Sequence, residues 1–152
     1  MNYLASLNLL LNAAATFYLV GVIWVVQRVH YPLFAAVGDE SFRDYQSQHL
    51  SRITPVVAAP MLIEAATAVI LIATLPPSAP PLAAWLGLGL LAVVWLSTWG
   101  LQVPRHDELV AGFDASAHAR LVATNWIRTA AWSLRGLLLI WILFRVLSGV
   151  DA

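Results

Sequence analysis

Apolar residues dominate four stretches of the chain, each about as long as a membrane-spanning helix. The stretches cover residues 4–26, 55–75, 82–103 and 129–147, and a bilayer core of about 30 Å needs roughly 20 apolar residues in helical form. Four of the six residues 76–81 are prolines, which leaves room only for a tight turn. The pattern predicts an all-α fold, a four-helix transmembrane bundle in one domain over residues 1–152, with its middle two helices adjacent and antiparallel.

Two longer connections between these stretches hold nearly all the charged residues. Because successive helices cross in opposite directions, both connections lie on one side of the membrane, and the positive-inside rule places them in the cytoplasm with both termini outside. The expected location is a bacterial inner membrane. The charged residues are Arg28, Asp39, Glu40, Arg43, Asp44 and Arg52 in the first connection, and Arg105, Asp107, Glu108, Asp114, Arg120 and Arg128 in the second.

Both connections contain the signals of a helix start. Residues 39–41 and 114–116 each place acidic and hydroxyl side chains just before a run with helical apolar spacing. We therefore expect the second and fourth helices to begin in the cytoplasm, well outside the hydrocarbon. Pro55 and Pro60 should kink the second helix.

Composition identifies lipid as the main solvent of this chain. Hydrophobic residues make up 61% and charged residues 11%, whereas soluble domains carry roughly 25% charged residues. The formal net charge is zero, which gives no reason to expect a nucleic-acid partner. The absence of cysteine excludes disulfides and thiolate metal sites.

The two halves of the chain repeat an order of polar residues. Gln27 precedes His49 by 22 positions, and Gln102 precedes Asn125 by 23. A duplication and a chance agreement both fit one sequence. A duplication would relate the two helical hairpins by an axis along the membrane normal and bring the matched residues together.

Glu64 and Arg135 are charged residues within predicted spans. A charge at the centre of a span costs roughly 2.5–3.5 kcal/mol on insertion scales, so such residues usually face the bundle interior and have a partner. Two interpretations stay open, a buried ion pair that fixes the helix register and a pair of charges that line a ligand cavity.

Polar residues from all four spans are predicted to line a funnel that opens to the cytoplasm. Several of those on the fourth helix share one face, at spacings of three, four and seven. Candidate catalytic residues are His49, His106, Arg128 and Arg135, and candidate ligand-binding residues are Gln27, His30, Tyr31, Arg52, Glu64, Gln102, Asn125 and Trp132.

His30, His49, His106 and Glu64 form the weak candidate set for a metal ion. None of them has the close intrahelical spacing of a recognised metal motif, and histidines near a membrane boundary are more often hydrogen-bonded surface groups. Haem would need two axial ligands at similar depth, such as His30 and His106. No cofactor is required by the sequence.

A small lipid-soluble ligand fits the candidate residues more simply. Arg52, Arg128 and Arg135 offer forked donors for an oxyanion, and the tryptophans offer flat apolar walls for an aromatic body. The predicted partners are membrane lipid and a small aromatic or quinone-like compound.

The chain resembles the anthrone-oxygenase-like family of small four-helix membrane proteins. The resemblance rests on Val-Pro-Arg-His-Asp-Glu-Leu at residues 103–109, Asn-Trp-Ile-Arg-Thr at 125–129, and residues 29–34. It implies oxidation of a phenolic or anthrone-type compound without a bound cofactor, with Arg128, Asn125 and His106 as the residues carried over. The family commonly has Asn where this chain has His106. Because of this departure, the resemblance alone does not transfer the family's substrate to this chain.

Three functions are compatible with these features. One is a membrane oxidase or oxygenase in which Arg128 and Arg135 stabilise an oxyanion while His49 or His106 acts as a base. Another is a non-catalytic binding or transport module, for which four helices would need a homo-oligomer. The third is a structural subunit of a larger membrane complex.

Overall fold

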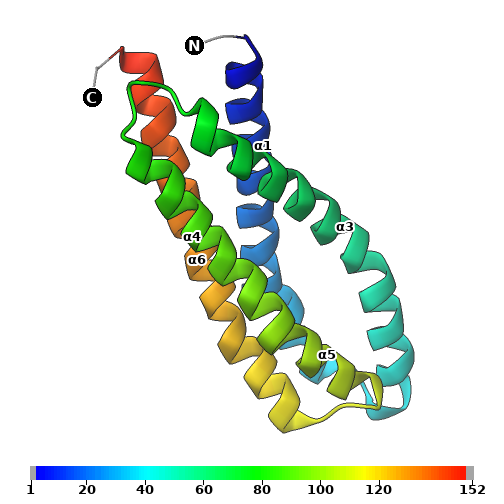
Figure 1. Ribbon diagram of the computed structural model, residues 1–152. Coiled ribbons are helices and arrows are strands. Elements are labelled where there is room, and N and C mark those ends of the chain that lie inside the picture. The colour runs from blue at the N-terminus through cyan, green and yellow to red at the C-terminus, as the bar shows by residue number, and fades with distance from the viewer. Residues whose placement is uncertain (1–2, 150–152) are drawn as a thin grey trace.

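The computed structural model describes residues 3–149 and has no strand among them. It is an all-α four-helix bundle, as predicted, with four helical segments that are long and apolar enough to cross a membrane (Figure 1). The first segment comprises α1 (Tyr3–Val25), the π-helix η1 (Val26–His30), α2 (Tyr31–Leu33) and the 3₁₀ helix η2 (Phe34–Ala36). The third segment comprises α4 (Pro81–Ser97), the π-helix η3 (Thr98–Gln102) and α5 (Val103–Val110). The second and fourth segments are single helices, α3 (Asp39–Thr74) and α6 (Ala115–Ser148).

The four segments alternate in direction, so the bundle has two unlike ends (Figure 1). The start of α1, the end of α6 and the proline-rich turn between α3 and α4 share one end, here called the turn end. The two connections that precede α3 and α6 share the other, here called the loop end. α3 and α4 are in contact, which confirms the predicted antiparallel pair. In the turn, the Ala79 N–H donates to the Pro76 carbonyl at 2.9 Å.

The first and third helical segments extend further than predicted, to Ala36 and Val110. The reason is a π-helix ahead of Pro32 and of Pro104. A proline lacks an N–H and its ring clashes with the carbonyl four residues earlier, and the wider π turn removes that clash while the helix continues. In both segments the residue before the proline donates its N–H five residues back, Tyr31 to Val26 and Val103 to Thr98. The two π-helices thus occupy the same place relative to their prolines.

α3 and α6 begin at Asp39 and Ala115, where the helix-start signals at residues 39–41 and 114–116 predicted them to begin. Asp114 caps α6, because its carboxylate accepts the Ala117 N–H at 2.7 Å. Hydrogen bonds from the Ser116 hydroxyl and the Ala117 N–H lower the pKa of Asp114. Gly38 is the N-cap of α3 and provides no side-chain cap, and Asp39 and Glu40 lie in the first turn of the helix.

α3 remains one helix through Pro55 and Pro60, although each proline removes a backbone donor. The helix bows away from α4 in the middle of the bundle and comes close to α5 again near the loop end (Figure 1). α1 packs mainly against α3, and α4 packs mainly against α6. The interior between these two pairs is where the polar side chains meet.

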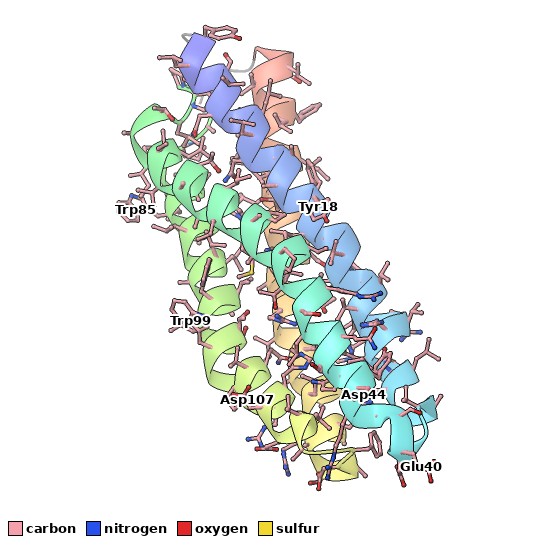
Figure 2. All side chains as sticks on the ribbon, turned by 90° about the vertical axis from the view of Figure 1, so that its right-hand side faces the viewer. Tyr18, Glu40, Asp44, Trp85, Trp99 and Asp107 are labelled. Carbon is pink, nitrogen blue, oxygen red and sulfur yellow. The ribbon has the colours of Figure 1, made fainter. Side chains whose placement is uncertain are left out.

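The outside of the bundle is apolar over most of its length. Trp85 and Trp99 point outward from the third segment and are 56% and 64% exposed (Figure 2). The labelled acidic residues Glu40, Asp44 and Asp107 lie toward the loop end (Figure 2). An exposed apolar belt of this extent is the surface expected of a chain whose solvent is lipid.

Candidate functional site

Glu64 and Arg135 form a fully buried ion pair, with 2.8 Å between Arg135 Nε and Glu64 Oε1. The two residues are 0% and 2% exposed. Glu64 also accepts hydrogen bonds from the Thr16 hydroxyl at 2.6 Å and from the Trp132 indole N–H at 3.0 Å. The ion pair predicted from the sequence is therefore present, and its carboxylate is held from three sides.

The other two nitrogens of the Arg135 guanidinium are occupied as well. Nη2 donates to Asn12 Oδ1 at 2.9 Å, and Nη1 donates to the backbone carbonyl of Gly87. Asn12 in turn donates to the Thr67 hydroxyl at 2.8 Å. This group, here called the inner cluster, consists of Asn12, Thr16, Glu64, Thr67, Trp132 and Arg135 and links all four helical segments.

The inner cluster leaves almost no space for a ligand. The void beside Asn12 and Arg135 has a volume of only about 10 Å³. Neither Glu64 nor Arg135 lines the larger cavity described next. Of the two interpretations of this pair, the geometry supports the one in which it fixes how the helices pack.

A cavity of about 430 Å³, here called the central cavity, lies between the inner cluster and the loop end. Most of its walls are apolar and come from all four helical segments. Its apolar lining includes Leu19, Ile23, Val57, Met61, Trp95 and Trp132, and its polar base consists of Tyr31, Gln102, His106 and Arg128.

Among residues 3–149, Arg128 is the only arginine that lines the central cavity. It is 7% exposed, and its Nε and Nη2 donate to Asn125 Oδ1 at 2.9 and 2.6 Å. None of the ion pairs within the same range includes Arg128. Asn125 is held by Gln27, whose Oε1 accepts the Asn125 amide at 2.8 Å. The buried guanidinium is thus held by neutral amides and lies 5.9 Å from the centroid of the Trp132 ring, and no described carboxylate forms an ion pair with it.

Tyr31 and His106 share a hydrogen bond of 2.8 Å between the phenol oxygen and Nε2. The direction of this bond follows from Gln46, whose Nε2 reaches both Nδ1 of His106 at 3.0 Å and the His106 carbonyl at 3.3 Å. A carbonyl only accepts, so this Gln46 atom is the amide nitrogen and Nδ1 is an acceptor. The proton of a neutral imidazole then sits on Nε2 and is donated to Tyr31.

The Tyr31 hydroxyl consequently has its own proton left to donate. Its oxygen receives the His106 N–H and lies 3.4 Å from Nη2 of Arg128. The side chain is 4% exposed and lines the central cavity. Tyr31 and Arg128 together therefore present an O–H donor and a guanidinium to the same space. Both ring nitrogens of His106 are engaged, so this residue holds Tyr31 in place.

His30 and His49 form a separate pair, with 2.8 Å between His30 Nε2 and His49 Nδ1. The two residues line a second cavity, of about 630 Å³, together with Arg52. Neither these histidines nor Arg52 lines the central cavity. The ring centroids of His49 and His106 are 5.4 Å apart, and no hydrogen bond joins them.

The structure brings the three histidines of the weak metal set close together but leaves Glu64 apart from them. Glu64 belongs to the inner cluster, whereas His30, His49 and His106 lie nearer the loop end. In the described part of the chain, no three His, Asp or Glu side chains are placed to share one metal ion.

Polar side chains from all four helical segments face the interior of the bundle, as the sequence predicted. His49, Glu64, Gln102 and Arg135 are all at most 7% exposed. The residues predicted to line one funnel are divided between two cavities, and fully buried apolar side chains pack together at the loop end. These are Phe34, Phe42, Leu109 and Leu121.

Sequence reasoning missed several residues that shape the site. Asn8, Asn12 and Thr16 recur every four residues along α1, and this polar stripe within an apolar span was a readable signal for the inner cluster. Gln46, which sets the His106 tautomer, carried no such signal because it lies among other polar residues.

Comparison of the chain with protein-family models, with curated proteins and with solved structures finds no match. The resemblance to the anthrone-oxygenase-like family therefore stays a prediction.

Proposed function

We propose that this membrane protein binds a small lipid-soluble aromatic compound with an acidic or carbonyl oxygen, such as a phenol or quinone, in the central cavity. The observation that carries the proposal is the Arg128 guanidinium, which has no ion-pair partner among the described residues and lies beside the Tyr31 hydroxyl at the polar base of the central cavity. A volume of about 430 Å³ lies within the range of small-molecule sites, roughly 300–1,000 Å³.

The two donors favour an oxyanion over a neutral oxygen. A hydrogen bond to a charged group contributes about 1.5–3 kcal/mol, roughly twice a neutral one. Trp95 and Trp132 supply flat walls for the aromatic body. In this proposal Asn125, Gln27 and His106 act as positioning residues.

The proposed orientation places the loop end in the cytoplasm and both termini outside. Its support is the concentration of arginines at the two long connections. The polar base of the central cavity would then lie in the cytoplasmic half of the membrane.

Titration calorimetry on the protein in lipid nanodiscs tests the binding proposal. Three probes of similar ring size separate the contributions: naphthalene has no oxygen, 1,4-naphthoquinone has neutral oxygens, and 2-hydroxy-1,4-naphthoquinone is an anion at neutral pH. We expect the anion to bind most tightly and Arg128→Gln to weaken it by about 10–100-fold, which corresponds to 1.5–3 kcal/mol.

Arg120→Gln is the matched control, because Arg120 is exposed and does not line the central cavity. Its affinity for all three probes should equal that of the unmodified protein. Equal affinity of the Arg128→Gln and Arg120→Gln proteins for the anionic probe would contradict the proposal.

A second candidate function is an oxidase or oxygenase acting on a phenolic or anthrone-type compound. It is favoured by the same donor pair, because Arg128 and Tyr31 would stabilise the electron-rich anion that reacts with dioxygen. In the balanced reaction a methylene carbon becomes a carbonyl: it takes one oxygen atom of dioxygen, and the other leaves as water with the two hydrogens.

Oxygen uptake with an anthrone as substrate distinguishes the two functions. An oxygenase should consume one dioxygen per anthrone faster than buffer does, and the Arg128→Gln protein should not. Uptake no faster than in buffer, combined with normal binding, would leave the protein as a binding or transport module.

A further inference from the structure

The central cavity is closed along the bundle axis in both directions. Toward the turn end, the hydrogen-bonded side chains of the inner cluster fill the interior. Trp132, which belongs to this cluster and also lines the cavity, is 1% exposed. Toward the loop end, Phe34, Phe42 and Leu109 are completely buried. A ligand that moved along the axis would have to separate one of these packed layers.

The side wall between the second and third segments is different. The lining residues contributed by α1 and α6 are all buried or half-buried. The exposed lining residues come only from α3, η3 and α5. They are Thr54, Trp99, Val103 and Asp107, here called the lateral opening.

Two backbone irregularities explain why this wall is open. α3 contains Pro55 and Pro60 and bows away from α4 at this level (Figure 1). The facing wall contains the π-helix η3, which ends at Gln102. Both depart from straight α-helical geometry where the two helices would otherwise pack together.

We propose that the ligand enters the central cavity sideways, from the hydrocarbon of the membrane, through the lateral opening. This inference rests on the proposed function and adds the source and shape of the ligand. Trp99 is 64% exposed and Val103 is 43% exposed, so an apolar surface borders the opening where lipid contacts the protein.

The position of the donors fixes how the ligand is oriented. Asp107 borders the opening on its loop-end side, and Tyr31 and Arg128 lie inside the cavity at its polar base. The ligand's oxygen therefore points to the polar base while its aromatic body lies toward the acyl chains. A flat compound that dissolves in lipid and carries its oxygen at one end satisfies both requirements.

A bulky residue in the opening tests the route without removing a donor. Thr54 borders the opening, and Thr74 on the same helix lies far from it; both hydroxyls donate to the carbonyl four residues earlier. We expect Thr54→Trp to slow association and dissociation of 2-hydroxy-1,4-naphthoquinone about equally, by tenfold or more, in stopped-flow measurements on nanodiscs. The equilibrium affinity should change less than threefold, and the Thr74→Trp protein should match the unmodified protein.

Unchanged rates in the Thr54→Trp protein would overturn the lateral route while leaving the binding proposal intact. So would a loss of affinity with an unchanged association rate, because that result describes a blocked site with a free route. Absence of binding by all three naphthalene probes would overturn the proposed function, and the inference with it.

A measurement independent of any ligand examines the opening itself. The chain has no cysteine, so Thr54→Cys provides a unique labelling site. A fluorophore at this position should be quenched more strongly by lipids with spin-labelled acyl chains than by a water-soluble quencher. Stronger quenching from water would place the opening outside the hydrocarbon and overturn the inference.

Discussion

Glu64→Gln should destabilise the protein far more than its small change in shape suggests. The substitution removes one negative charge and leaves the Arg135 guanidinium, 2% exposed, without its counter-ion. Removing one partner of a buried ion pair costs about 3–5 kcal/mol, because the remaining charge is desolvated and unpaired. The substitution would also replace one of the two acceptor oxygens with an amide nitrogen, either Oε1, which accepts from Thr16 and Arg135, or Oε2, which accepts from Trp132.

The exposed ion pairs that Glu108 forms with Arg105 and Arg120 provide the control. The side chains of Arg105, Arg120 and Glu108 are 29%, 52% and 43% exposed, and an exposed pair contributes about 0–1 kcal/mol. The free energy of unfolding can be measured for both variants by titration with sodium dodecyl sulfate in mixed micelles, followed by helical circular dichroism. Glu108→Gln should change it by no more than about 1 kcal/mol.

A double-mutant cycle distinguishes pairing from simple loss of packing. Arg135→Met alone should cost a similar amount to Glu64→Gln, and the two together should cost clearly less than the sum. Additive losses, or a Glu64→Gln protein as stable as the Glu108→Gln protein, would refute the assignment of Glu64 and Arg135 as a coupled structural pair.

Three further results are expected. Gly87→Ala should lower the free energy of unfolding by about 1–3 kcal/mol, because the added Cβ would lie 2.9 Å from Arg135 Nη1. Gly89→Ala is the control: a Cβ at that position has no neighbouring atom within 4 Å, so the same titration should show no loss of stability. Tyr31→Phe should weaken 2-hydroxy-1,4-naphthoquinone about tenfold in calorimetry, since one hydrogen-bond donor is lost. Because the pKa of Asp114 is lowered in the folded protein, its carboxylate stabilises the fold at pH values above 3.8, the ordinary pKa of the group, and this contribution is lost as the pH falls through the lowered pKa. Asp114→Asn should remove that part of the pH dependence of the free energy of unfolding.

The bundle could be predicted because lipid constrains sequence so strongly. A span must be long, apolar and helical, so the four stretches and the proline-rich turn were sufficient to predict the fold. The first and third spans were predicted to end at residues 26 and 103, but both helical segments continue past Pro32 and Pro104. They continue because each proline is preceded by a π-helix, and a π-helix has no sequence signature as clear as the proline itself.

The site was predictable in composition and less so in arrangement. Arg128, His106 and Tyr31 were expected to meet, and they do. Glu64 and Arg135 were expected to share the same space, but they form a separate layer. Which polar residues meet depends on the depth and rotation of each helix, and one π-helix changes both for every residue beyond it.

The inner cluster also affects how the protein responds to an electric field. A single charge moved across a membrane couples to its potential by about 2.3 kcal/mol per 100 mV. Glu64 and Arg135 carry opposite charges and are held together by several hydrogen bonds, so a movement of this layer transfers no net charge. The cluster can therefore fix four helices together at the same packing whether the membrane is energised or not.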